Sequence, residues 1–197
     1  MPWKDRYMTN EPFELPVLSG HLLRLRGWRA SDAPTVQEAS HDPLIPLITT
    51  VPTTDGEAEA LAFIARQHDR MRTRAGYVFA IADAHDLAVG HIGLFPVSGA
   101  EGRASVGYWV TPSQRRKGYA AEALGILTSW ARRFDDLDRL ELYVEPWNTG
   151  SWRAAECAGY EREGLLSAWE KIDGIPKDMY MYGALTSTAL ASRSGAN

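Results

Sequence analysis

The pattern of hydrophobic and polar positions divides the chain into short strands and amphipathic helices. Segments rich in β-branched and aromatic residues predict strands at 21–28, 77–82, 88–95, 106–110, 139–144 and 179–182. Apolar residues that recur at helical spacing predict helices at 61–71 and 120–134. Two further helices are expected, after Ser31 and after Asn148, and a further strand precedes the last one. This order of elements indicates an α+β fold rather than a strict β-α-β alternation.

Local signals predict where the helices begin and end. Pro34 lies where proline is accepted in the first turn of a helix. Thr54 and Glu57 fit a capping box for the helix that ends near Arg72. The prolines between residues 41 and 52 exclude a long helix there, so we expect that segment to form a connection.

Length and composition fit one domain. The chain has 197 residues, and its hydrophobic fraction of 45% is enough for a full core. We expect residues 1–20 to form an N-terminal arm without regular structure, residues 21–185 to form the domain, and residues 186–197 to form a flexible C-terminal tail.

Charge and residue usage exclude several classes of function. A net charge of −4 argues against a broad nucleic-acid surface. Cys157 is the single cysteine, so no intrachain disulfide forms, and a cytoplasmic location is favoured. No segment approaches the ~18 continuous apolar residues of a membrane span. The histidines are scattered without metal-ligand spacing, so no metal site is expected.

A basic loop between a strand and a helix is the clearest candidate for binding chemistry. It contains Arg115, Arg116, Lys117 and Gly118, and it follows the strand 106–110. The first N–H groups of the following helix and the adjacent cations predict a site for a phosphate-bearing ligand. A Walker loop is excluded because Lys117 is not followed by Ser or Thr, and a dinucleotide loop is excluded because the three spaced glycines are missing.

The segment from Arg115 to Ala120 resembles the (Gln/Arg)-x-x-Gly-x-(Gly/Ala) loop with which the GCN5-related N-acetyltransferases (the GNAT superfamily) hold the pyrophosphate of acetyl-coenzyme A. A second match follows at the expected distance, where Asn148, Ser151 and the pair Gly159-Tyr160 occupy the family's Asn-x-x-Ser and Gly-aromatic places. The resemblance extends from about residue 22 to residue 181. Within the superfamily, the chain looks most like the ribosomal-protein N-terminal (RimJ/RimL-like) branch.

The resemblance implies a fold and a set of cofactor contacts. The fold is a mixed, mostly antiparallel sheet that is splayed into a V and flanked by helices on both faces, with acetyl-coenzyme A between the strands of Tyr108 and Leu142. The pyrophosphate would meet the loop, because Gly118 lacks the Cβ that would block its approach. The expected cofactor-binding residues are Trp109, Val110, Arg115, Arg116, Lys117, Gly118, Tyr119, Ala120 and Asn148.

The sequence also indicates candidate catalytic residues. By resemblance, Ser151 protonates the departing thiolate, although a serine at this junction is equally expected to cap a helix. Relatives carry a glutamate base where this chain has Ser105. Glu141 is the candidate substitute, because it shares a strand face with Tyr143 and Glu145; a solvated strand position is the alternative. His91 is a further candidate base by residue type alone.

These features together predict an acetyl-coenzyme A-dependent N-acetyltransferase. The expected acceptor is an amine, either a peptide N-terminus or a small molecule, and residues 43–54 are candidates for selecting it. The alternative is a non-catalytic module of the same fold that binds acetyl-coenzyme A or coenzyme A, which the serine at position 105 favours. The sequence leaves a homodimer open.

Overall fold

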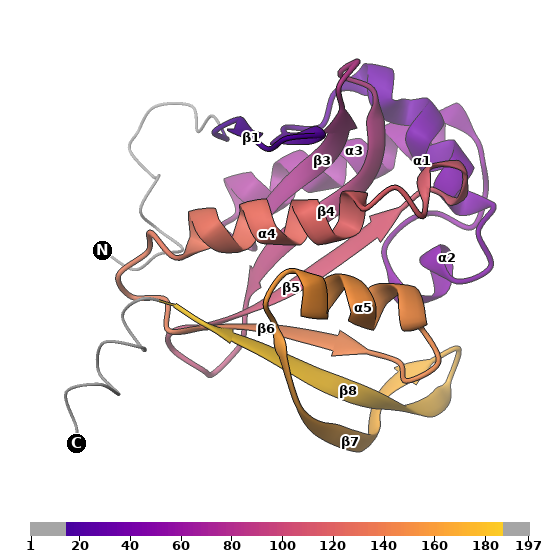
Figure 1. Ribbon diagram of the computed structural model, residues 1–197. Helices are drawn as coiled ribbons and strands as arrows, with labels where there is room; N and C mark the ends of the chain where they lie inside the picture. The colour runs from indigo at the N-terminus through magenta and orange to yellow at the C-terminus, as the bar shows by residue number, and fades with distance from the viewer. Residues whose placement is uncertain (1–14, 187–197) are drawn as a thin grey trace, which may run out of the picture.

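The computed structural model describes residues 15–186, which form an open sheet with helices on both faces (Figure 1). The strands are β1 (Leu18–Ser19), β2 (Leu23–Arg26), β3 (Tyr77–Asp83), β4 (Ala88–Pro96), β5 (Arg103–Val110), β6 (Arg139–Val144), β7 (Glu161–Ile172) and β8 (Ile175–Leu185). The helices are η2 (Ala30–Asp32), α1 (Ala33–Ser40), α2 (Ile45–Ile48), α3 (Glu57–Arg72), η3 (Pro112–Gln114), α4 (Tyr119–Ala131) and α5 (Thr149–Cys157). The predicted order of the main strands and helices is confirmed, and the short elements β1 and α2 are additions to it.

The sheet has the order β1-β2-β3-β4-β5-β6-β8-β7. Its neighbouring strands are antiparallel except β5 and β6, which are parallel because α4 forms the crossover between them. The β5–β6 ladder ends at the pair Ser105–Glu141, although both strands continue beyond it. The two strands therefore diverge, and this divergence is the V of the predicted mixed, mostly antiparallel sheet, which is confirmed.

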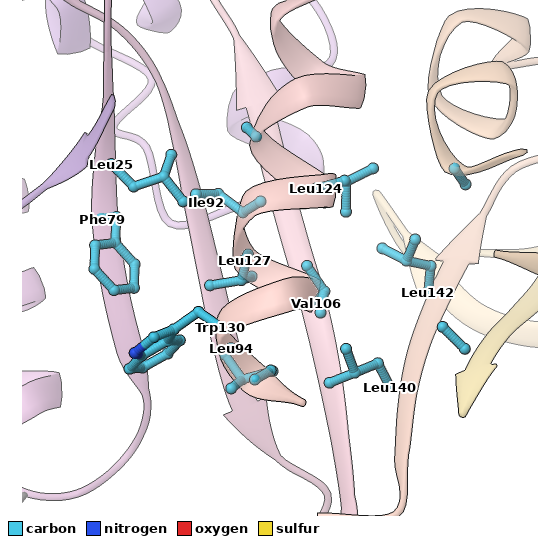
Figure 2. Close-up of a cluster of buried hydrophobic side chains, with 14 of the residues drawn as sticks. Leu25, Phe79, Ile92, Leu94, Val106, Leu124, Leu127, Trp130, Leu140 and Leu142 are labelled. Atoms are coloured by element: carbon cyan, nitrogen blue, oxygen red, sulfur yellow. The ribbon is translucent and has the colours of Figure 1, made fainter. Parts of the chain in front are cut away.

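One core lies between the sheet and the helices α4 and α5. Apolar residues of α4 recur at helical spacing and are buried, so one face of the helix packs on the sheet. Figure 2 shows Leu124, Leu127 and Trp130 of α4 in one cluster with Ile92 and Val106 of the sheet. This packing fixes the N-terminus of α4 beside the end of β5.

A second core lies on the opposite face, under α1 and α3. Trp28, Phe63 and Trp109 are buried there together, and the rings of Trp28 and Phe63 meet edge to face at 5.5 Å. Burial of both faces explains why β3 is a nearly continuous apolar run rather than an alternating one.

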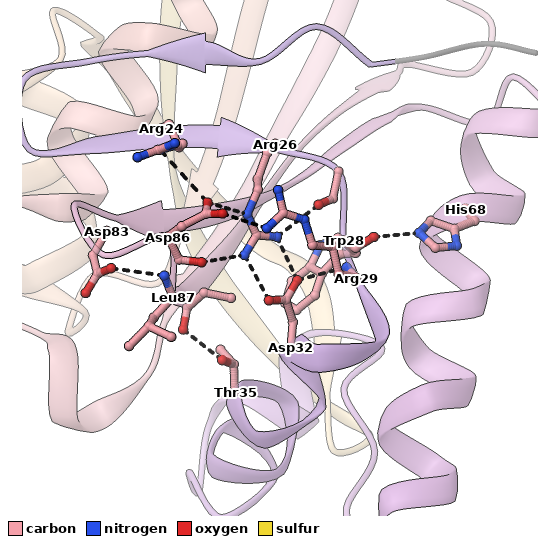
Figure 3. A network of polar contacts seen from close by, with 12 residues as sticks. Arg24, Arg26, Trp28, Arg29, Asp32, Thr35, His68, Asp83, Asp86 and Leu87 are labelled. Carbon is pink, nitrogen blue, oxygen red and sulfur yellow. Dashed lines mark hydrogen bonds and ion pairs between the residues drawn. The ribbon is translucent and has the colours of Figure 1, made fainter.

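A buried ion-pair network joins β2 to the β3–β4 turn (Figure 3). The Arg26 guanidinium is 2% exposed and donates to both carboxylate oxygens of Asp32, at 2.8 and 2.9 Å. It also donates to Asp86, which accepts a further bond from Arg29. Hydrogen bonds from Arg29 and Arg26 hold the pKa of the Asp86 carboxyl below its usual range. The network fastens the start of α1 to the sheet.

Two sequence predictions are corrected. Leu18–Ser19 form a short strand with β2, although no regular structure was expected as far as residue 20. The predicted capping box at Thr54 is wrong, because α3 begins at Glu57 with Gly56 as its N-cap and without a side-chain cap bond. The other parts of the predicted arm and tail, residues 1–14 and 187–197, lie outside the described residues.

Candidate active site

The backbone of the basic loop turns the N-terminus of α4 toward open space. Arg116 and Gly118 have φ angles of +62° and +81°, and α4 follows directly. The first intrahelical bond runs from Glu122 N to Gly118 O, so the preceding N–H groups, from Tyr119 to Ala121, have no partner within the helix. A Cβ at Gly118 would meet no atom within 4 Å. The loop therefore offers unpaired donors to an anion, as the sequence predicts.

The three cations of the loop differ in their contacts. Arg115 is tied inward, because its Nε donates to Val110 O at 3.1 Å and its Nη2 pairs with Asp42 Oδ2 at 2.6 Å. Lys117 donates to Gln114 within the loop. Arg116 is exposed and forms no ion pair within residues 15–186. Arg115 thus positions the loop against β5, while Arg116 and Lys117 are on its accessible side.

Asp42, which follows α1, holds the basic loop in place through its ion pair with Arg115. It is buried, and its Oδ1 accepts the backbone N–H groups of Leu44 and Ile45 at the start of α2. Burial alone would raise the pKa of Asp42, but these two N–H groups and Arg115 outweigh burial and lower it. The carboxylate therefore stays charged and holds Arg115 in place. Glu38 of α1 adds a second anchor by accepting the Ser113 N–H at 2.9 Å.

The end of β5 presents backbone groups to the gap between β5 and β6. Thr111 N donates to Val89 O at 3.0 Å, which makes this register position a hydrogen-bonded pair with β4. Such pairs alternate along an antiparallel ladder, so the N–H and C=O groups of Val110 and Tyr108 point away from β4. Trp109 alternates with them, and its backbone groups bond to β4. Val110 N–H therefore faces the gap, where the sequence predicts a cofactor contact, and the Trp109 backbone does not.

A cavity of about 450 Å³ opens where β5 and β6 diverge. Its lining comes from α3 and β4 on one side of β5, and from β6, α5 and the β7–β8 hairpin on the other. Cavities of this size hold small ligands or the end of a peptide. The polar side chains that line it include Arg70, His91, Tyr108, Glu145, Asn148 and Ser151.

Two hydroxyl groups meet across the gap. Tyr108 Oη donates to the Ser151 carbonyl at 2.8 Å, and Ser151 Oγ lies 2.8 Å from the same Oη. Because a tyrosine has one hydroxyl proton, Ser151 Oγ donates to Tyr108 Oη in this arrangement. Burial raises the pKa of Tyr108 to about 12, so its hydroxyl remains protonated at neutral pH.

The helix cap at this junction is Asn148 rather than Ser151. The Asn148 side chain accepts the Ser151 N–H at 3.2 Å, and α5 begins directly after Asn148. The Ser151 hydroxyl is engaged with Tyr108 instead of with a backbone N–H, so the expectation that it serves as the cap is wrong. Its hydroxyl faces the cavity beside Asn148.

Glu141 lies in an ion-pair cluster away from the cavity lining. Its carboxylate is fully buried and accepts hydrogen bonds from Arg103 at 2.6 Å, from Arg139 at 2.9 Å and from Tyr143 at 2.7 Å. Burial alone would raise the pKa of Glu141, but these three donors outweigh burial and lower it. A carboxylate held in this way is a weak base, and the contacts favour a structural role.

Glu145 is a buried carboxylate that lines the cavity, and sequence reasoning missed it. It is 6% exposed, and within residues 15–186 its carboxylate has no hydrogen-bond or ion-pair partner. The signal was present in the sequence, because the strand alternation puts Glu145 on the same face as Tyr143. A buried carboxylate without a partner is available to an incoming amine.

His91 is a neutral part of the cavity wall. Its ring stacks on that of Trp109, with centroids 5.8 Å apart and planes at 6°. Burial, followed by repulsion from Arg70, lowers the pKa of His91 to about 3, so the imidazole is uncharged at neutral pH. A histidine of this pKa is a poor general base. Trp109 contributes its ring to the cavity wall.

The described part of the chain contains neither a metal-binding cluster nor a membrane-spanning helix. Between residues 15 and 186, no group of three or more His, Cys, Asp or Glu side chains is placed to hold a metal ion. No helix in the same range is long and apolar enough to cross a membrane.

Comparisons with known proteins agree with this geometry. The family model described as an acetyltransferase (GNAT) domain matches residues 23–161. An uncharacterized N-acetyltransferase p20 of Bacillus licheniformis is 28% identical, over 83% of this chain and 92% of its own length. A putative ribosomal-protein-serine acetyltransferase of Vibrio cholerae superposes with a TM-score of 0.73 at 24% identity, over 86% of this chain and 97% of that one.

A third relative was solved with a bound ligand. RimJ of Mycobacterium smegmatis, in complex with CoA-disulfide, superposes with a TM-score of 0.72 at 24% identity, over 91% of both chains. At these identities the two solved structures show that the fold is shared, while the family model covers most of this sequence, including the basic loop and the Asn148–Ser151 junction. The chain belongs to the GNAT acetyltransferase family and is an acetyltransferase.

Proposed function

We propose that this acetyltransferase transfers the acetyl group of acetyl-coenzyme A to an amine bound in the cavity between β5 and β6. The observation that carries the proposal is the arrangement at the gap, where the unpaired carboxylate of Glu145 and the Ser151–Tyr108 hydroxyl pair line one cavity. One is a proton acceptor and the other a proton donor, as direct transfer from a thioester to an amine requires.

The residues around the α4 N-terminus fit the donor substrate. The N–H groups of Gly118, Tyr119 and Ala120 would bind the pyrophosphate, with Arg116 and Lys117 adding charge. Arg115 would act at one remove, by holding the loop against β5 through Val110 and Asp42. The backbone groups of Tyr108 and Val110 would bind the pantetheine amide and the thioester oxygen, with Val110 N–H as the oxyanion donor.

In this scheme one residue is assigned to each proton transfer of the reaction. Acetyl-coenzyme A supplies an activated acyl carbon, which the amine nitrogen attacks. Glu145 accepts the proton that the amine loses as the C–N bond forms. Ser151 Oγ donates its proton to the sulfur as the C–S bond breaks, after its O–H rotates away from Tyr108 Oη. Ser151 then regains a proton from the Glu145 carboxylic acid through solvent, so both side chains return to their starting states. Asn148 keeps Ser151 in position by capping α5. Glu141 has no part in this scheme.

The acceptor we propose first is a peptide N-terminus, with a small-molecule amine as the second candidate. The peptide is supported by two structural neighbours, RimJ of Mycobacterium smegmatis and the putative ribosomal-protein-serine acetyltransferase of Vibrio cholerae. The cavity volume of about 450 Å³ suits either. A cytoplasmic location completes the proposal and is supported by the single cysteine, Cys157.

The test is the release of coenzyme A thiol from acetyl-coenzyme A, measured with a panel of peptides and small amines. We expect release above the amine-free rate with at least one acceptor, together with an acetylated product by mass spectrometry. Calorimetry with coenzyme A is run on the same sample. Tight binding without release by any amine would reject transfer and support the non-catalytic module instead.

A further inference from the structure

We propose that the acceptor amine also carries a carboxylate, which binds Arg70 on the α3 side of the cavity. This inference rests on the proposed function, and it names the class of acceptor. Among residues 15–186, the cavity combines a cation without a counterion on one side of β5 with an unpaired carboxylate, Glu145, on the other. An acceptor with both an amine and a carboxylate complements both groups.

Arg70 lines the cavity without an acidic partner. Its Nη1 donates to Gln67 Oε1 at 3.1 Å and its Nη2 to Thr50 Oγ1 at 3.3 Å, and its guanidinium lies 5.6 Å from the centre of the Phe95 ring. All three partners are neutral. No carboxylate of residues 15–186 lies within ion-pair distance of Arg70, although its side chain is half-buried.

A second arginine increases the local positive charge. Arg66, one turn earlier in α3, donates from its Nη2 to the Thr50 carbonyl at 3.0 Å, so two guanidinium groups converge on Thr50. Burial, followed by repulsion from Arg66, lowers the pKa of Arg70, but a guanidinium remains charged at neutral pH. A bound anion would relieve both the repulsion and the lost hydration.

The remaining lining leaves this charge uncompensated. His91 of β4 lies on the same side of β5 as Arg70 and is uncharged, because its pKa is about 3. The carboxylates of the lining are Glu145, directly after β6, and Glu170 of β7, and both lie across β5 from α3. The field in the cavity therefore runs from cation to anion. A carboxylate-bearing amine aligns with this field, whereas an amine with a second positive charge opposes it.

The carboxylate can come from a free amino acid or from an acidic side chain near a peptide N-terminus. Matched pairs of acceptors separate these sources from each other and from neutral amines. The peptide pair is Ser-Asp-Ala-Ala and Ser-Asn-Ala-Ala, both with an amidated C-terminus so that the side chain carries the sole carboxylate, and the small-molecule pair is γ-aminobutyrate and γ-aminobutyramide. Within each pair the amine and the shape are the same and only the anion differs.

The experiment measures kcat and KM for both pairs with the wild type, Arg70→Gln and Arg72→Gln. Arg72 is the matched control, because it lies on the same helix and pairs with Asp69 in solvent. For the acidic acceptor we expect Arg70→Gln to raise KM by about 10- to 100-fold, the usual range for a charged hydrogen bond, with kcat little changed. The neutral acceptor and the Arg72→Gln enzyme should show no such change.

Other outcomes overturn the inference. Equal use of acid and amide by the wild type would do so, as would an equal loss with both acceptors in Arg70→Gln. If the wild type acetylates no amine at all, the proposed function fails, and calorimetry on the coenzyme A-bound protein then decides the carboxylate site. Binding of the acid but not the amide, lost in Arg70→Gln, would support the site, and equal binding of both would reject it.

Discussion

The Ser151 hydroxyl lies 2.8 Å from the Tyr108 hydroxyl, in a pair that joins α5 to β5 across the gap between the strands. The two residues are 43 positions apart in the chain. Their contact depends on the divergence of β5 and β6 beyond Ser105, because continued pairing of the strands would close the space that the hydroxyls occupy. The candidate proton donor is thus a product of the sheet's shape.

Removal of the Ser151 hydroxyl should affect turnover and leave the fold intact. We expect Ser151→Ala to lower kcat by ~10²–10⁴, the share of one acid–base group, with the affinity for acetyl-coenzyme A little changed. Tyr108→Phe leaves Ser151 its proton, so it should lower kcat by less. Asn148→Ala is the stability control, because loss of the cap of α5 should cost ~1 kcal/mol. Near-normal turnover by Ser151→Ala would remove Ser151 from the mechanism.

The two carboxylates of β6 and its end should separate activity from stability. Glu145→Gln keeps the shape of the side chain and removes the proton acceptor, so we expect kcat/KM to fall by ~10²–10⁴ near neutral pH. The loss should shrink as pH rises, because more of the amine is then already neutral. Initial rates from pH 6 to pH 9.5 measure this. A constant deficit across that range would contradict a role as base.

Glu141→Gln is the paired experiment. The substitution removes a buried charge from between Arg103 and Arg139, so we expect the free energy of unfolding to fall by about 1.5–3 kcal/mol, the usual value of a hydrogen bond to a charged group. The enzyme that remains folded should keep its kcat. Denaturant titration and initial rates are measured on the same preparation, and a large loss of kcat without loss of stability would return Glu141 to the list of candidate bases.

Much of the fold and part of the site follow from local sequence patterns. The element order and the basic loop are predictable because periodicity, proline and glycine act within a few residues of themselves. The pairing of Arg115 with Asp42 is not, because 73 positions separate them. The sequence treats the three loop cations as equivalent, whereas the fold ties one inward and leaves the others accessible.

The catalytic carboxylate is not predictable from local sequence patterns either, for the same reason. Strand alternation predicts Glu141 and Glu145 on one face and cannot distinguish them, since the difference lies in neighbours from other elements. Arg103 reaches Glu141 from β5, where the two strands still pair, and Glu145 lies beyond the point of divergence. The register between strands that are far apart in the sequence therefore decides which of the two carboxylates pairs with an arginine.

The loop should depend on Gly118 for its conformation and for access of the ligand. Gly118 has a φ angle of +81°, so a β-branched residue there is strained, and its side chain would also enter the space expected for a phosphate. We expect Gly118→Val to weaken coenzyme A binding severely in calorimetry. Gly99→Val is a matched control, because Gly99 has a φ angle of +73°, equally open surroundings and a place in the β4–β5 turn. Similar losses of affinity in both variants would indicate general strain rather than a phosphate site.

His91 should dominate the response of stability to mild acid. Its pKa is lowered from 6.5 to about 3 in the folded protein, so between these values the unfolded chain binds a proton that the folded protein does not. The contribution of His91 to stability is therefore complete above pH 6.5 and is lost as the pH falls toward 3. The expected slope from this one group is about 1.4 kcal/mol per pH unit.

The variant His91→Phe tests this slope while it preserves the stacking on Trp109. We expect the free energy of unfolding of the variant to fall less steeply between pH 6 and pH 4, by about 1.4 kcal/mol per unit, than that of the wild type. Because Asp42, Glu141 and the other acids are present in both proteins, their contributions cancel in the difference. His85→Phe, in the exposed β3–β4 turn, should retain the wild-type slope. The opposite outcome is the same pH dependence of the free energy of unfolding for the wild type and His91→Phe in urea titrations. That result would mean that the imidazole is protonated as readily in the folded protein as in the unfolded chain, and it would contradict the prediction.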